Sequence, residues 1–152
     1  GACAVLGRMD ATRVLLGYLE LFSFMTSANP LYCAPELKGI FTRLLAKTHG
    51  GVQLHALRCL CVWGDPGVVP YKKNLENIID DEKYRHELSL FQVDAECSVV
   101  LPEHRKQLLP VLTRLLYAKV VQRKVQGAKA ALSQRRAHVL AWFAGVCVRV
   151  CV

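Results

Sequence analysis

Basic side chains are the residues of this sequence best placed to do chemistry, because they recur along one stretch and can neutralise phosphates. The candidate contacts to RNA or to an acidic partner are Arg105, Lys106, Arg114, Lys119, Arg123, Lys124, Lys129, Arg135 and Arg136. Tyr117 is the one aromatic residue that accompanies the first six of them, so base stacking is poorly supported. We expect contact with the charge and shape of structured RNA, while a solvated helix face or docking onto an acidic protein would give the same pattern.

Charge is distributed unevenly along the chain. From Glu103 onward there are ten Lys and Arg residues against one acidic residue, whereas the preceding part has ten against eleven. The second part therefore carries +9 and the preceding part −1, which together give the net charge of +8. This asymmetry indicates an anionic partner there, with nucleic acid favoured over a membrane surface.

Cysteine and histidine could in principle bind metal or act as nucleophiles. The cysteines are Cys3, Cys33, Cys59, Cys61, Cys97, Cys147 and Cys151. Cys59 and Cys61 have the wrong spacing for a zinc-binding pair, and the helical pair of His55 and Cys59 has no second pair nearby. No recognisable nucleophile motif surrounds any of them. We expect no metal site, no cofactor and no catalytic residues.

Two other short motifs are explained by helix ends. Gly50-Gly51 predicts the turn of a helical hairpin with a left-handed cap, because the Lys-Ser/Thr of a phosphate-binding loop is missing. Asp80-Asp81 predicts a cap at the start of the following helix, where acids satisfy exposed N–H groups and the helix dipole. The chain is therefore expected not to be an enzyme.

The odd number and irregular spacing of the seven cysteines predict a reducing compartment, cytosolic or nuclear, rather than a disulfide scaffold. No signal peptide opens the chain, and no apolar run approaches the roughly 20 residues that span a bilayer. The 152 residues begin without an initiator Met, so we expect a fragment of a longer protein.

Helical periodicity must position the basic residues, and it is clearest in residues 102–124. The apolar face of this stretch contains Leu108, Leu112, Leu115, Leu116 and Val120. Pro102 suits a first helical position, whereas Pro110 predicts a kink or a break. A further helix is expected over residues 129–144, with Arg135 and Arg136 facing outward.

The same periodicity recurs upstream, where strand signals are nearly absent. The expected helices are residues 9–25, 35–47, 52–63, 71–79 and 84–91. The first of these has an apolar stripe of Ala11, Val14, Leu15, Tyr18, Phe22 and Met25. Short turns join neighbouring helices into hairpins at a period of roughly 40 residues. The predicted fold is all-α, an α-solenoid of two to three HEAT-like helical hairpins.

The last residues do not follow this pattern. Residues 146–152 alternate like a strand, which would have no partner. We therefore expect a helical repeat region over residues 1–145 and an atypical tail over residues 146–152, for which truncation is as good an explanation as real structure.

Four segments carry a resemblance to a known family. His49 to Leu60 (HGGVQLHALRCL) resembles the second helix of a HEAT repeat. Tyr71 to Leu88 (YKKNLENIIDDEKYRHEL) and Glu103 to Tyr117 (EHRKQLLPVLTRLLY) resemble the conserved region of the DRIM family. Ser133 to Gly145 (SQRRAHVLAWFAG) is similar to that family's next helix. The cysteine-rich tail departs from the family pattern.

The resemblance implies a non-catalytic scaffold in ribosome biogenesis, because DRIM proteins are large HEAT-repeat components of the nucleolar small-subunit processome. It implies a role in processing the small-subunit pre-rRNA and a nuclear, nucleolar location. Implied partners are processome proteins, pre-rRNA or the U-three small nucleolar RNA, and neighbouring HEAT repeats of the same long chain, with no membrane. The alternative is a generic HEAT-repeat protein–protein interaction module of the transport-receptor or kinase-scaffold type.

Overall fold

The chain forms a stack of α-helices. The structure, a computed structural model, describes residues 8–91, 99–122 and 129–150. The α-helices are α1 (Arg8–Ser23), α2 (Ala34–Leu44), α3 (Gly50–Cys61), α4 (Lys72–Ile79), α5 (Tyr84–Leu90), α6 (Arg105–Val121) and α7 (Lys129–Val150). Two short 3-10 helices are η1 (Val69–Tyr71) and η2 (Pro102–His104). No described residue lies in a strand, so the all-α prediction is confirmed for these ranges.

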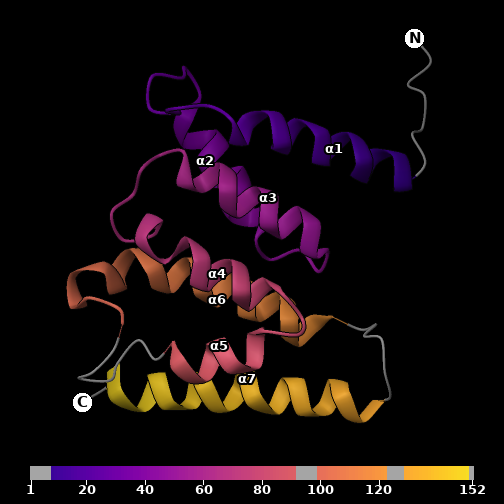
Figure 1. Cartoon of the computed structure of the whole chain (residues 1–152), viewed down its shortest axis with the longest axis vertical. Helices are drawn as coiled ribbons and strands as arrows, with labels where there is room; N and C mark the ends of the chain where they lie inside the picture. The colour runs from indigo at the N-terminus through magenta and orange to yellow at the C-terminus, as the bar shows by residue number, and fades with distance from the viewer. Residues whose placement is uncertain (1–7, 92–98, 123–128, 151–152) are drawn as a thin grey trace.

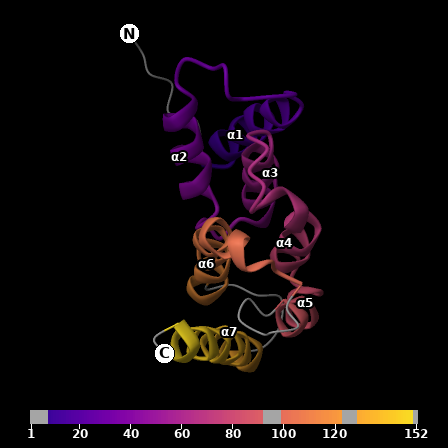
Figure 2. The same cartoon turned by 90° about the vertical axis from the view of Figure 1, so that its left-hand side faces the viewer.

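The helices are arranged in successive layers. Figure 1 shows α1 at one end, followed by α2 and α3, then α4 and α6, and finally α5 and α7. The quarter-turn view in Figure 2 shows α2, α6 and α7 along one side and α3, α4 and α5 along the other. Direct packing joins α3 to α1, α2 and α4, and α6 to α4 and α7. Each inner helix therefore has neighbours on more than one side.

The hairpin of α2 and α3 forms as the sequence predicts, with one difference in its turn. Pro35 lies in the first turn of α2, where its missing N–H costs nothing. Gly50 and Gly51 open α3 rather than forming a left-handed cap, because the His49 side chain caps this helix by accepting a bond from the Val52 N–H. Among the described glycines, the one in the left-handed region is Gly64, at φ +70°, just after α3.

Helix α6 runs through Pro110 as one helix, so of the kink or break that the sequence predicted, the break is wrong. Because proline has no backbone N–H, the Lys106 carbonyl has no helical donor at Pro110. Pro110 and Lys106 are both exposed, so water can reach this carbonyl. The buried residues Leu108 and Leu112 flank the proline and hold both sides against the core. Packing therefore outweighs the local preference of proline to end the helix.

The strand-like alternation noted for residues 146–152 does not give a strand in the described part of the tail, because α7 continues as a helix to Val150. Extending an existing helix adds a backbone hydrogen bond with each residue, whereas a lone strand leaves its edges unpaired. The alternation of valine with other residues was therefore not sufficient to change the backbone conformation. Cys151 and Val152 lie outside the described residues.

The start of α6 is fixed to the chain that follows α3. The Tyr71 hydroxyl accepts a hydrogen bond from the Leu101 N–H at 2.9 Å and lies 3.0 Å from Nδ1 of His104. The Gln107 side chain accepts a bond from the Gly67 N–H at 2.9 Å. These contacts orient α6 and the basic residues that it carries.

Candidate nucleic-acid interface

The helical period of α6 places its basic residues on different faces of the helix. Its buried face contains Leu108, Leu112, Leu115 and Leu116, which are fully enclosed. Its opposite face exposes Lys106 and Tyr117. Arg114 lies at the edge of that face, and its guanidinium donates to the Pro110 carbonyl at 2.8 Å. Lys106 and Arg114 are therefore the described basic residues of α6 that an external anion could approach from this side.

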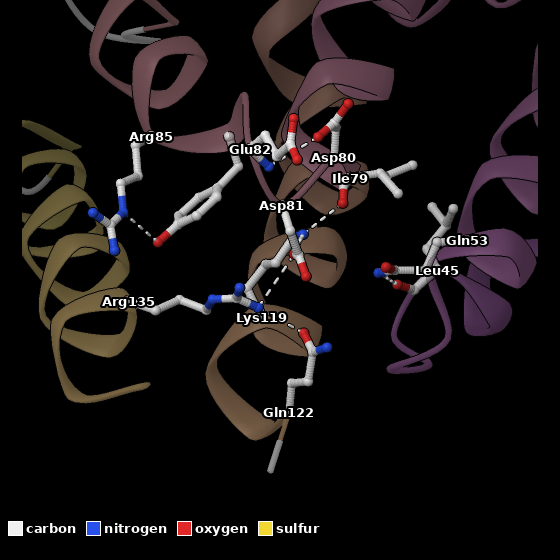
Figure 3. A network of polar contacts seen from close by, with 11 residues as sticks. Leu45, Gln53, Ile79, Asp80, Asp81, Glu82, Arg85, Lys119, Gln122 and Arg135 are labelled. Carbon is white, nitrogen blue, oxygen red and sulfur yellow. Dashed lines mark hydrogen bonds and ion pairs between the residues drawn. The ribbon is translucent and has the colours of Figure 1, made fainter. Parts of the chain in front are cut away.

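Lys119 does not belong to this exposed surface, because only 3% of it is exposed. Its ammonium group donates to the Ile79 carbonyl and to the Asp81 carboxylate, each at 2.5 Å. Figure 3 shows the lysine reaching from α6 to the turn between α4 and α5. The sequence grouped Lys119 with the cationic residues, but its place four residues after Leu115 puts it on the apolar face.

Arg135 is also buried, at 4% exposure, so the prediction that it faces outward is wrong. Its Nη1 donates to the Gln122 side chain at 2.8 Å and lies 3.2 Å from the Asp81 carboxylate. Leu132 and Val139 lie three residues before it and four after it, so Arg135 shares the inward face of α7. The charge of Asp81 allows a cation to occupy that face.

An aromatic ring completes this cluster. Tyr84, 1% exposed, has the Lys119 ammonium 5.4 Å and the Arg135 guanidinium 5.3 Å from its ring centre. Such distances allow attraction between a cation and the face of the ring. Arg85 donates to the Tyr84 hydroxyl at 3.1 Å and to the Gln134 side chain at 3.3 Å. We refer to Asp81, Tyr84, Lys119 and Arg135 as the Asp81 cluster.

Electrostatics within the Asp81 cluster follow from burial and pairing. Burial lowers the pKa of Lys119, because it disfavours the ammonium form, and the bond to Asp81 only partly offsets this. Partial burial alone would raise the pKa of Asp81, but the hydrogen bonds and charges of Lys119 and Arg135 outweigh it and hold that pKa below its usual value. One carboxylate thus pairs with two buried cations, an arrangement that joins α6 and α7 to the α4–α5 turn.

Sequence reasoning missed Asp81 because it placed both adjacent acids at a helix cap. Asp80 does accept a bond from the Glu82 N–H at 2.9 Å, but α5 begins at Tyr84 after a Lys83 cap without a side-chain bond. Asp81 turns instead toward α6 and α7. The available signal was the presence of lysine and arginine on two apolar helix faces, which requires an acidic partner.

The remaining predicted contacts divide by exposure. Arg136 is exposed, and its Nε donates to the Val120 carbonyl at 3.0 Å. Arg105 is half-buried, with its Nε enclosed and without a hydrogen-bond partner among the described residues. Arg123 and Lys124 lie outside the described residues, and Lys129 is described only as the first residue of α7. The structure therefore brings Lys119 and Arg135 together in the interior, and leaves Lys106, Arg114 and Arg136 accessible.

The described residues also bear on metal binding, thiol chemistry and membrane spanning. Across residues 8–91, 99–122 and 129–150, no three His, Cys, Asp or Glu residues gather closely enough to hold a metal ion. Cys59 is buried, its thiol donates to the Leu19 carbonyl, and burial raises its pKa to about 12. The raised pKa thus keeps the Cys59 thiol in its unreactive neutral form.

None of the described helices is long and apolar enough to cross a membrane.

Comparison with known proteins identifies the family. A sequence profile described as U3 small nucleolar RNA-associated protein 20, N-terminal, matches residues 10–149. The chain belongs to this family. It is 30% identical over 118 residues to U3 small nucleolar RNA-associated protein 20 of Schizosaccharomyces pombe, which covers 77% of this chain and 5% of that protein. The protein of the same name from Saccharomyces cerevisiae is 25% identical over 130 residues, again 5% of its length and 80% of this chain.

These relatives of the U3 small nucleolar RNA-associated protein 20 family are far longer than the matched segment. The chain spans about 5% of the length of each. The profile match covers all seven α-helices described above, from the first turns of α1 to the last turn of α7. The Asp81 cluster and the exposed basic residues therefore both lie inside the family region.

Proposed function

We propose that this chain is part of a non-catalytic scaffold in ribosome biogenesis that supports small-subunit pre-rRNA processing within the nucleolar processome. The observation that carries the proposal is the family match over residues 10–149. It favours this function over a generic HEAT-repeat interaction module. The proposed location is the nucleolus, and the proposed partners are processome proteins and pre-rRNA or the U3 small nucleolar RNA named in the relatives.

A scaffold of this kind fits a stack of helical layers. We also propose that the helices form two to three HEAT-like hairpins of an α-solenoid, as in the DRIM family. Its support is the short α2–α3 hairpin and the successive packing of α3 on α4 and of α6 on α7. Repeat stacks present long surfaces for partners while each unit contacts only its neighbours.

The proposed contact with RNA uses the accessible basic residues rather than the whole basic set. Lys106, Arg114 and Arg136 can meet phosphates, with Arg105 at the margin and with Arg123, Lys124 and Lys129 as further candidates from the sequence. Lys119 and Arg135 are assigned to the interior of the Asp81 cluster. Each phosphate contact that is lost should weaken binding and reduce its salt dependence.

The test is crosslinking in cells of the complete protein that contains this chain, followed by sequencing of the bound RNA. The variant carries Lys106→Gln, Arg114→Gln and Arg136→Gln. The matched control carries Arg13→Gln, Arg43→Gln and Lys72→Gln, which remove the same charge from exposed positions on α1, α2 and α4. We expect pre-rRNA crosslinks to fall by about fivefold or more in the variant and to persist in the control.

The outcomes distinguish RNA contact by these three residues from the scaffold role of the protein. Equal crosslinks in the variant and the control would overturn RNA contact by these three residues while leaving the scaffold role. Absence of pre-rRNA and of U3 small nucleolar RNA from the wild-type protein would overturn the scaffold role itself. Lys119 is left unchanged, because its loss would disturb folding and mimic a binding defect.

A further inference from the structure

Helix α1 has an apolar surface that the described part of the chain does not cover. Its members are Val14, Gly17, Tyr18 and Leu21, which we call the α1 outer face. Tyr18 and Leu21 are each 69% exposed, and Phe24, which follows the end of α1, is 75% exposed. Large apolar residues so exposed and so close together mark an interaction surface more often than chance placement does.

The opposite side of α1 is already buried. Leu19 is 2% exposed and Phe22 stacks with Trp63 at 5.8 Å between ring centres, so this side packs on α3. The sequence placed Val14 and Tyr18 in the same apolar stripe as Leu15 and Phe22, but the structure exposes the first two and packs the other two against the core. A helix that is apolar on two sides is expected to have two packing neighbours.

The shape and charge of the α1 outer face favour a helix as the second neighbour. Val14, Tyr18 and Leu21 follow steps of four and three residues, the spacing used in helix-to-helix seams. A shallow groove of about 390 Å³ runs between them over Gly17, where an added Cβ would meet nothing within 4 Å. Among the described residues that line the groove, the charged one is the acidic Glu20, which disfavours a phosphate-bearing ligand there.

The position of α1 and the length of the relatives indicate where such a helix comes from. In Figure 1, α1 forms one end of the stack, and the inner helices α3 and α4 are each covered by helices on both sides. The matched relatives are about twenty times longer than the segment that aligns with this chain, so most of a family protein lies outside it.

We propose that the α1 outer face is the docking site for an amphipathic helix from another part of the same long polypeptide. The aliphatic side of that helix lies across Tyr18 and Leu21, with one of its side chains seated over Gly17. The inference rests on the proposed scaffold function, since it treats the chain as one section of a longer stack. It excludes RNA and a second copy as the occupant of this face.

Site-specific photo-crosslinking in the complete protein tests the proposal. The photoreactive p-benzoyl-phenylalanine replaces Tyr18 in one sample and Tyr32 in the control. Tyr32 is the same residue type, is fully exposed, and lies in the α1–α2 connection away from the α1 outer face. We expect Tyr18 to give an intramolecular crosslink to the apolar side of a helix outside this chain, in severalfold excess over Tyr32.

A second variant, Gly17→Gln, checks that the crosslink reports docking. The space above Gly17 is open within the chain, and glutamine is the better helix former, so α1 itself remains folded. The added side chain fills the groove, and loss of the Tyr18 crosslink is expected. A crosslink to a second copy, to another protein or to RNA, or a yield no higher than that at Tyr32, would overturn the proposal.

The same samples separate this inference from the proposed function. Recovery of pre-rRNA with the wild-type protein measures processome association independently of the crosslink. An intramolecular crosslink without pre-rRNA would retain the docking site and remove the scaffold role. Recovery of pre-rRNA without the crosslink would retain the scaffold role and remove the docking site.

Discussion

Between α1, α2 and α3 the interior is closed by aromatic rings, whereas between α4, α6 and α7 charged groups contribute to the closure. Phe22, Phe41 and Trp63 meet with ring centres 4.8 to 5.8 Å apart. In the other region Asp81 pairs with the buried Lys119 and Arg135. The aromatic contacts require only shape, but the ionic contacts require every partner to be present. The two regions should therefore respond differently to substitution and to pH.

The largest expected effect comes from the aromatic region. Trp63→Ala should lower the free energy of unfolding by about 3 kcal/mol or more, because it leaves a cavity between α1, α2 and α3. Urea unfolding followed by circular dichroism measures the change. Trp63→Phe should lower the free energy of unfolding by a smaller amount. Tyr32→Ala, at an exposed position, should leave it nearly unchanged. An effect of Trp63→Ala as small as that of Tyr32→Ala would contradict the role given to this cluster.

A smaller loss is expected from the ionic region. Asp81→Asn should cost about 2 kcal/mol, below the 3–5 kcal/mol typical of a fully buried pair, because the Asp81 side chain is 48% exposed. Adding Lys119→Met should recover stability, since the double variant no longer buries an unpaired ammonium group. The same urea measurement on both single variants and the double variant completes a mutant cycle. Additive losses would show that Asp81 and Lys119 are not coupled.

The smallest effect is the dependence on pH, which should appear only in the ionic region. Asp81 has a lowered pKa in the folded chain, so its contribution is present above the unfolded value of about 3.9 and is lost as pH falls through the folded value. The stability difference between wild type and Asp81→Asn should therefore shrink on acidification. The difference between wild type and Trp63→Ala should stay constant by comparison. A difference for Asp81→Asn that does not change with pH would argue against the ion pair.

The sequence predicted the helices well, because each has a distinct apolar period and recognisable ends. The expected helices at residues 9–25 and 52–63 correspond to α1 and α3 within a few residues. Helix α6 does not break at Pro110, and residues 146–150 form no strand despite their alternation, because helix packing and helix propagation override these local preferences.

The candidate site was less predictable than the fold. Exposure of Lys106 and Arg136 follows from their helical positions, but burial of Lys119 and Arg135 depends on Asp81, which lies 38 residues before Lys119 in the chain. A net charge or a basic stretch cannot distinguish a cation that meets RNA from one that meets a buried carboxylate. The periodic position of each residue is the information that separates them.

The Asp81 cluster also constrains how this part of the protein can change over evolutionary time. Loss of Asp81 leaves two cations enclosed without their carboxylate, and loss of either cation leaves the other alone with Asp81 and the Tyr84 ring. A substitution at one of these positions is tolerated more readily once a compensating substitution has occurred at another. Asp81, Lys119 and Arg135 are therefore expected to vary together among related proteins, whereas Lys106 and Arg136 are free to vary one at a time.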